Sequence, residues 1–103
     1  MVENEGKGAV VLYLHLGQDT VVTLGEIIGI FDLDTTTVSK ATRKYLADAE
    51  KAGDVINVSM ELPKSFIVCA NAGRPSGRVI YISQISSATL LKRTEFMDKL
   101  ANI

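Results

Sequence analysis

The sequence contains no tryptophan, one cysteine, one histidine and two prolines among its 103 residues, and these shortages exclude several classes of protein. Because Cys69 is the only cysteine, the chain has no internal disulfide, and nothing in it indicates an oxidising compartment. We interpret Cys69 as a small buried apolar residue rather than a reactive thiol. The sequence has no Cys/His cluster, no Walker loop and no GxGxxG motif, so zinc binding and nucleotide chemistry are not supported.

Groups that could carry out catalysis are equally scarce. His15 is the only imidazole and lies within an expected strand, which favours a place on a sheet surface or at a subunit contact, where mild acid would change its charge. Asp19, Asp32 and Asp34 offer oxygen ligands for a hard cation such as magnesium. For Asp32 and Asp34 we favour a different role over metal binding. A carboxylate at the start of a helix accepts hydrogen bonds from backbone amides and interacts well with the helix dipole. We expect no enzyme activity, no cofactor and no metal.

Charge and hydropathy constrain the partners. The net charge is −1 and the sequence pI is about 5.7, so contact with nucleic acid would need a local basic patch. Hydrophobic residues make up 47% of the chain, more aliphatic surface than so small a globule easily hides, which leaves self-association and a tightly packed monomer both open. The beginning MVENEGKG is polar, and no run reaches membrane-spanning length. We expect a cytoplasmic protein without membrane contact.

The first half of the chain reads as strands followed by a helix. Leu12, Leu14 and Leu16 alternate with other residues at period two, and Gly17-Gln18-Asp19 allows an immediate turn. Two further β-branched runs, around residues 21–22 and over 27–31, complete a meander. A helical pattern follows, with Asp34 or Thr35 as its expected cap and Gly53 as its stop.

The second half repeats this arrangement. Short strands are expected over 55–59, 65–71 and 78–83, with the loop AGRPSG joining the last two as a hairpin. Ser86 or Ser87 then caps a second helix that runs to about Ala101. The order βββαβββα predicts an α+β class: a small single domain with a largely antiparallel sheet and two helices. Residues 1–10 are expected to form a disordered lead-in, and residues 11–103 the domain.

Several motifs are shared with a known family. They are HLG at 15–17, the VV pair, IIGIFD, LPKS at 62–65 and ISQISSATLLKRTEFM at 82–97. On these motifs, over about residues 11–100, the chain resembles the RemB-type (YaaB-like) branch of the RemA/RemB family of bacterial extracellular-matrix regulators. The resemblance implies a LytTR-like subunit of a homo-oligomeric ring. It also implies a transcription regulator that binds double-stranded DNA and controls matrix (biofilm) or osmolyte genes.

Basic residues at loop and helix starts are the candidates for binding DNA. Lys64 follows a proline that restrains the chain just before a strand. Arg74 and Arg78 bracket the hairpin loop, where Arg74 either enters a narrow minor groove or only aids solubility. Lys92 and Arg93 would meet either phosphates or the acidic residues of a neighbouring subunit. The full set of candidate DNA-binding residues is Lys64, Ser65, Arg74, Arg78, Lys92, Arg93, Arg43 and Lys44.

The chain also departs from the family in ways that bear on DNA binding. In RemA relatives the segment matching Leu62 to Ser65 is arginine-rich and implicated in binding DNA, whereas Leu62 and Pro63 stand here beside the single Lys64. Glu26 stands where that branch carries another arginine. The alternative is therefore a ring-forming protein-interaction scaffold with little or no DNA affinity, which assembles with a paralogous regulator.

Overall fold

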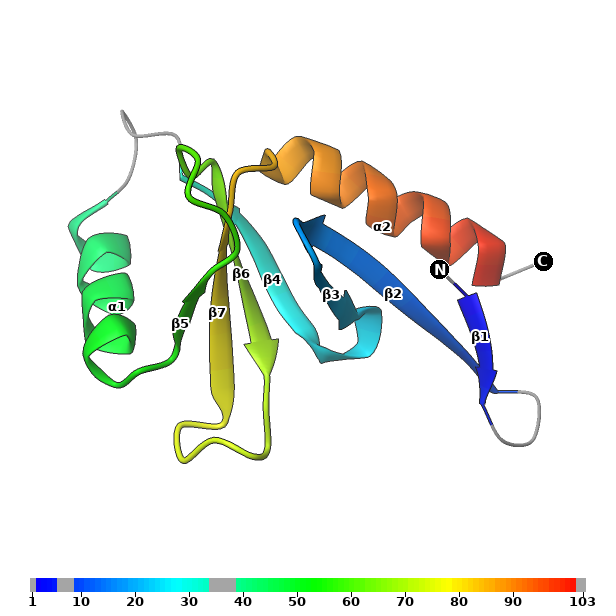
Figure 1. Cartoon of the computed structure of the whole chain (residues 1–103), viewed down its shortest axis with the longest axis horizontal. Helices are drawn as coiled ribbons and strands as arrows, with labels where there is room; N and C mark the ends of the chain where they lie inside the picture. Colours follow the sequence, from blue (N-terminus) through cyan, green and yellow to red (C-terminus); the bar gives the residue numbers. More distant parts are fainter. Residues whose placement is uncertain (1, 6–8, 34–38, 102–103) are drawn as a thin grey trace.

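The computed structural model describes residues 2–5, 9–33 and 39–101 (Figure 1). The order of the elements is four strands, a helix, three strands and a helix, with a short 3-10 turn before the fourth strand. Their bounds are β1 Val2–Glu5, β2 Ala9–Gly17, β3 Thr20–Thr23, η1 Leu24–Glu26, β4 Ile27–Asp32, α1 Lys40–Lys51, β5 Val55–Asn57, β6 Ser65–Ala70, β7 Arg78–Ser83 and α2 Ser87–Ala101. The predicted α+β class is confirmed.

The strands form two sheets. A three-stranded sheet has the order β1-β2-β3, and a four-stranded sheet has the order β4-β6-β7-β5. All pairs are antiparallel except β5 with β7, which are parallel. Since β6 already lies between β4 and β7, the free edge of β7 is the position left for β5, and the chain reaches it after α1. The expected hairpin between β6 and β7 is confirmed.

The beginning of the chain differs from the expected disordered lead-in over residues 1–10. Strand β1 pairs with the first part of β2, from Val2 opposite Leu12 to Glu5 opposite Ala9. Strand β2 has nine residues and β3 only four, so β2 extends beyond the hairpin. The division of the chain into a lead-in and a domain over 11–103 stays a prediction.

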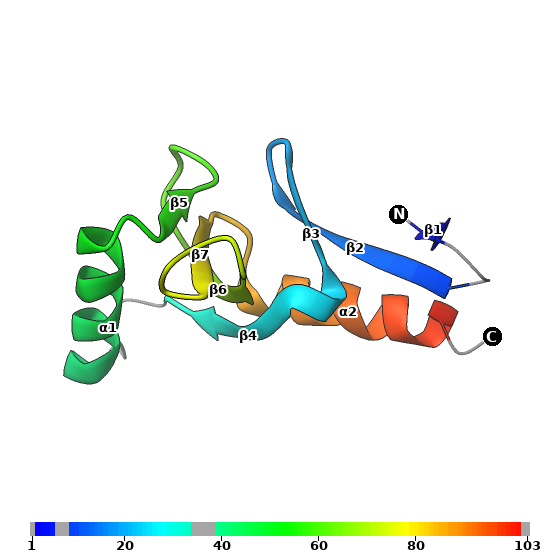
Figure 2. The same cartoon turned by 90° about the horizontal axis from the view of Figure 1, so that it is seen from below.

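The core lies on both faces of β6. Ile67 and Cys69 are fully buried with the core of β2, β3 and α2, whereas Phe66 and Val68 pack with residues of α1 and β5. This division follows from the alternation of side chains along a strand. Figure 2 shows α1 on one side of β6 and β7, and α2 with the β2–β3 hairpin on the other. Strand β6 is therefore the central strand of a three-layer arrangement.

The β2–β3 hairpin has the predicted alternation. Leu14 and Leu16 are buried while His15 is exposed. Gly17 ends the strand at φ 120°, and a Cβ there would lie 2.7 Å from Oε1 of Gln84. The backbone conformation therefore favours glycine at this position.

Both helices begin at serines whose side chains accept backbone hydrogen bonds. Ser39 Oγ accepts from the Thr42 amide at the start of α1, while the expected caps Asp34 and Thr35 lie outside the described residues. Ser86 Oγ accepts from the Thr89 amide, which confirms the predicted start of α2. Within the described residues, neither helix combines the length and the apolar character that crossing a bilayer requires.

Candidate functional site

The two hairpin arginines converge on a buried carboxylate. Arg78 Nε lies 3.5 Å from Asp54 Oδ2, and Arg74 Nη1 lies 3.8 Å from Asp54 Oδ1. Arg74 Nη1 also donates to the Gly53 carbonyl at 2.8 Å. The Arg78 guanidinium lies 4.7 Å from the centre of the Tyr45 ring. These contacts tie the end of α1 to the β6–β7 hairpin, and Asp54 offsets one of the two positive charges.

The burial of this cluster limits what the arginines can reach. The Asp54 side chain is 4% exposed, whereas those of Arg74 and Arg78 are 30% and 26% exposed. A hydrogen bond that Arg78 donates to Tyr45, with a smaller contribution from Asp54, raises the pKa of Arg78 above its ordinary value. Arg78 is therefore a charged residue held against α1. Arg74 keeps part of its guanidinium at the surface.

Lys64 and Ser65 have different environments although they are adjacent. The Lys64 backbone is held between two strands, because its amide donates to the Ser83 carbonyl at 2.8 Å and its carbonyl accepts from the Leu33 amide at 2.9 Å. Its side chain is exposed. Ser65 is fully buried, and its Oγ donates to the Ile85 carbonyl at 2.7 Å. Lys64 thus has a fixed backbone and an exposed charged side chain, while the Ser65 hydroxyl is used inside the fold.

The cations of the two helices are exposed. Arg93 Nη1 donates to the His15 carbonyl at 3.2 Å, which connects α2 to β2. Lys92 and Arg93 border a surface hollow of about 290 Å³ together with Phe96. On α1, Lys44 pairs with Asp48 at 3.0 Å, a surface ion pair of the kind that contributes little to stability, and Arg43 is also exposed.

The candidate cations do not share one surface of a single chain. The β6–β7 turn, with Arg74, and the segment that joins β5 to β6, with Lys64, lie at opposite ends of the strands (Figure 1). The cations of α1 and α2 lie on opposite sides of the four-stranded sheet (Figure 2). Lys64 and the start of α2 form the more open group, since Ser65 and Ser83 link that strand end to the turn before α2.

Glu26 and Cys69 occupy structural positions in the fold. No group of three or more His, Cys, Asp or Glu residues among residues 2–5, 9–33 and 39–101 could hold a metal ion. Glu26 Oε1 accepts from the Thr23 amide at 2.8 Å, which completes the turn before β4. Burial, and then the charge of Glu26, raises the pKa of Cys69 to about 11.

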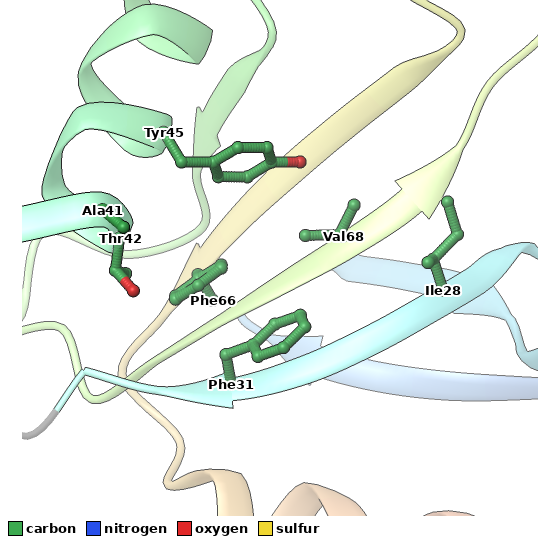
Figure 3. Close-up of a pocket in the computed structure, with 7 residues that line it drawn as sticks. All are labelled: Ile28, Phe31, Ala41, Thr42, Tyr45, Phe66 and Val68. Carbon is green, nitrogen blue, oxygen red and sulfur yellow. The ribbon is translucent and has the colours of Figure 1, made fainter. Parts of the chain in front are cut away.

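An apolar groove lies between α1 and the strands β4 and β6. It was not predicted from the sequence. Its volume is about 370 Å³. The rings of Phe31 and Phe66 stack at its base, with centroids 4.9 Å apart and planes inclined by 18°. The lining residues are Ile28, Phe31, Ala41, Thr42, Tyr45, Phe66 and Val68 (Figure 3). The sequence feature that could have indicated this groove is the run IIGIF at 27–31, because its apolar residues do not alternate regularly as in a half-buried strand.

Comparison with known proteins gives a relative that matches most of the chain. The chain matches no model of a known protein family. It is 35% identical, over 89 residues, to extracellular matrix regulatory protein B of Bacillus subtilis (strain 168). The match covers 86% of this chain and 98% of that protein. This identity over almost the full length of the relative agrees with the motifs seen in the sequence, and the chain therefore belongs to the RemA/RemB family of extracellular matrix regulatory proteins.

Proposed function

We propose that this protein is a cytoplasmic, non-enzymatic, homo-oligomeric regulator of extracellular-matrix genes that binds double-stranded DNA. The observation that carries the proposal is the similarity to a protein named for matrix regulation. The two are 35% identical, and the match covers 98% of that relative. Surface cations at one end of the sheet, above all Lys64, supply the groups that would contact phosphates.

Oligomerisation is needed because one chain offers few free cations. Among the described candidates, Arg78 is held by Asp54 and Tyr45, and Arg74 lies at the other end of the strands, so Lys64 and Lys92 are the exposed cations near that end of the sheet. Non-specific sites with so few contacts reach a Kd of only about 10⁻⁴ to 10⁻⁶ M at physiological salt. Repeating the same contacts around a ring raises the affinity by about 10² to 10⁴ where several subunits engage together.

Fluorescence anisotropy with duplex DNA over about 50 to 200 mM salt tests the proposal. We expect the affinity to fall steeply as salt rises, because each contact releases counterions. Lys64→Ala should lower the slope of log K against log salt by about 0.9 for each phosphate that the variant no longer neutralises.

Lys51→Ala is the matched control, because it removes the same charge from an exposed position at the end of α1. It should leave the salt slope unchanged. Binding that does not depend on salt, or no binding at low salt and high protein concentration, would contradict the DNA-binding proposal.

Two observations favour a second candidate, a ring-forming interaction scaffold with little DNA affinity. Asp54 offsets one positive charge of the hairpin pair, and Glu26 occupies a position where the RemA branch carries arginine. Such a scaffold would assemble with a more basic paralogous regulator. Capture of that regulator by this protein in defined mixtures, with no measurable affinity for duplex DNA, would decide for the scaffold.

A further inference from the structure

The apolar groove depends on an irregularity in strand β4. Ile27 lies opposite Cys69 and Gly29 lies opposite the next residue, Val68, so Ile28 is an additional residue between them. This bulge lets both Ile27 and Ile30 pack toward the main core, although they are three positions apart. Ile28 is then 67% exposed beside the groove, and neither strand pairing nor core packing accounts for a large apolar side chain there.

The aromatic base of the groove is also partly open. The Phe31 ring lies over Gly29, where a Cβ would come within 2.6 Å of it. Phe31 stacks on Phe66 yet is 45% exposed. Figure 3 shows Phe31 and Phe66 on neighbouring strands, with Tyr45 of α1 on the other side of the groove. The groove therefore has a flat aromatic base and an apolar wall, a shape suited to an apolar side chain.

Helix α2 carries apolar residues on two sides. Leu90 is fully buried against the main core. Phe96 and Leu100, four positions apart and therefore on one face of the helix, are 59% and 38% exposed. Apolar residues spaced in this way are the usual anchors of a helix that lies in a groove. This face belongs to the part of α2 that extends away from α1 (Figure 1).

The exposed area of the chain is larger than that of a compact monomer, which leaves surface available for contacts between copies. The chain exposes 6785 Å², whereas a compact monomer of its mass would expose about 5,700 Å². The difference of about 1,100 Å² is comparable to what one subunit buries at one or two contacts, since a standard interface takes about 800 Å² from each partner. A second copy of the chain would supply both an apolar groove and an exposed apolar helix face.

We propose that the groove between α1 and β4 receives the Phe96 and Leu100 face of α2 from a second copy of this chain. The inference rests on the homo-oligomer proposed above and assigns its contact surfaces. Because the two surfaces differ, each copy offers a groove to one neighbour and a helix face to the next. Such a head-to-tail contact adds copies one after another, and it forms a ring where the rotation between neighbours closes.

Mass measurement by light scattering on two variants and on their mixture tests this contact. Ile28→Glu damages the groove and Phe96→Glu damages the helix face, and both positions are exposed, so the fold should survive. Because an ionised carboxylate in an apolar site is costly, each variant should weaken association by about 100-fold or more. Each alone should have the 11.1 kDa mass of one chain.

The mixture gives the sharper result. Ile28→Glu keeps an intact helix face and Phe96→Glu keeps an intact groove, so an equimolar mixture should form a complex of two chains and no larger species. Met60→Glu is the matched control, because Met60 is fully exposed between β5 and β6 and lies on neither surface. It should keep the wild-type mass.

The possible outcomes separate this contact from the proposed function. Wild-type mass for either groove or helix variant, or a mixture that stays at one chain, would overturn the contact while leaving an oligomeric wild type intact. A wild type that is itself one chain would overturn both the oligomer and the contact. An assembly that behaves as expected but binds no DNA supports the contact and rejects only DNA binding.

Discussion

At the scale of single residues, Cys69 links stability to pH. Burial raises its pKa from the ordinary 9.0 to about 11, so the folded chain holds the thiol proton more tightly than the unfolded chain does. The stabilisation is complete below pH 9 and is lost as the pH rises to 11. The free energy of unfolding should fall by about 2 to 3 kcal/mol across this range, in addition to the effect of other groups.

Urea unfolding of the wild type and of Cys69→Ala at several pH values checks this expectation. Below pH 9 the variant should be less stable because its core is less well packed, but its stability should decline less between pH 9 and 11. Tyr81, whose pKa is also raised by burial, contributes to the decline in both proteins. Equal declines in the two proteins would contradict the role of Cys69.

The hairpin arginines show what sequence alone could not provide. Their positions beside the loop were predictable, but their partner Asp54 is 24 residues from Arg78 along the chain. Nothing in the local motif indicates that pairing, which depends on how α1 packs against the sheet. The burial of Ser65 could not be predicted for the same reason, because its hydroxyl donates to the carbonyl of Ile85, 20 residues away along the chain. The position of Lys64 was easier to predict from the sequence, because the adjacent proline and the start of the next strand define it locally.

At the scale of elements, Ser83 joins the two sheets. Its Oγ donates to the Leu16 carbonyl at 2.6 Å and accepts from the Ile85 amide at 3.0 Å, and the residue is fully buried. Ser83→Ala leaves both groups without this partner. The free energy of unfolding should fall by about 1 to 3 kcal/mol, as measured by urea unfolding.

Ser76→Ala serves as the comparison, because Ser76 is an exposed serine in the β6–β7 turn. Its effect should stay within about 0.5 kcal/mol. A Ser83→Ala variant as stable as Ser76→Ala would show that the two sheets do not depend on this hydrogen bond.

Elements with a clear local pattern were predicted well. Strand β7 and the start of α2 agree with the sequence analysis, since β-branched runs, turn residues and a capping serine define them locally. The separation into two sheets, the parallel pairing of β5 and the strand β1 were not predicted. Each depends on which strand edge is free after the others have paired, and that is a property of the whole sheet.

At the scale of the whole molecule, the chain is elongated. It measures 44 × 30 × 23 Å, and its radius of gyration is 14.4 Å, compared with about 13 Å for a compact domain of this length. The β1–β2 end and α2 extend beyond the four-stranded sheet (Figure 1). The shape and the exposed apolar residues both favour packing against other copies.

Association of folded copies should make thermal stability depend on concentration. If only folded chains associate, the Tm of the wild type should rise as the protein concentration is raised, because association draws chains out of the unfolded state. Ile28→Glu, with its groove damaged, should show a Tm that does not change with concentration. Differential scanning fluorimetry over a wide concentration range measures both, and a constant Tm for the wild type would contradict the association.

The bulge in β4 has a consequence for how this family can change. Ile28 is the residue that the strand pairing skips, so a deletion of its codon would leave every other pair of β4 in place. Such a lineage would keep the fold while losing one wall of the groove. Under the proposed contact, this single deletion would therefore remove an assembly surface without disturbing the strand pairing that maintains the fold.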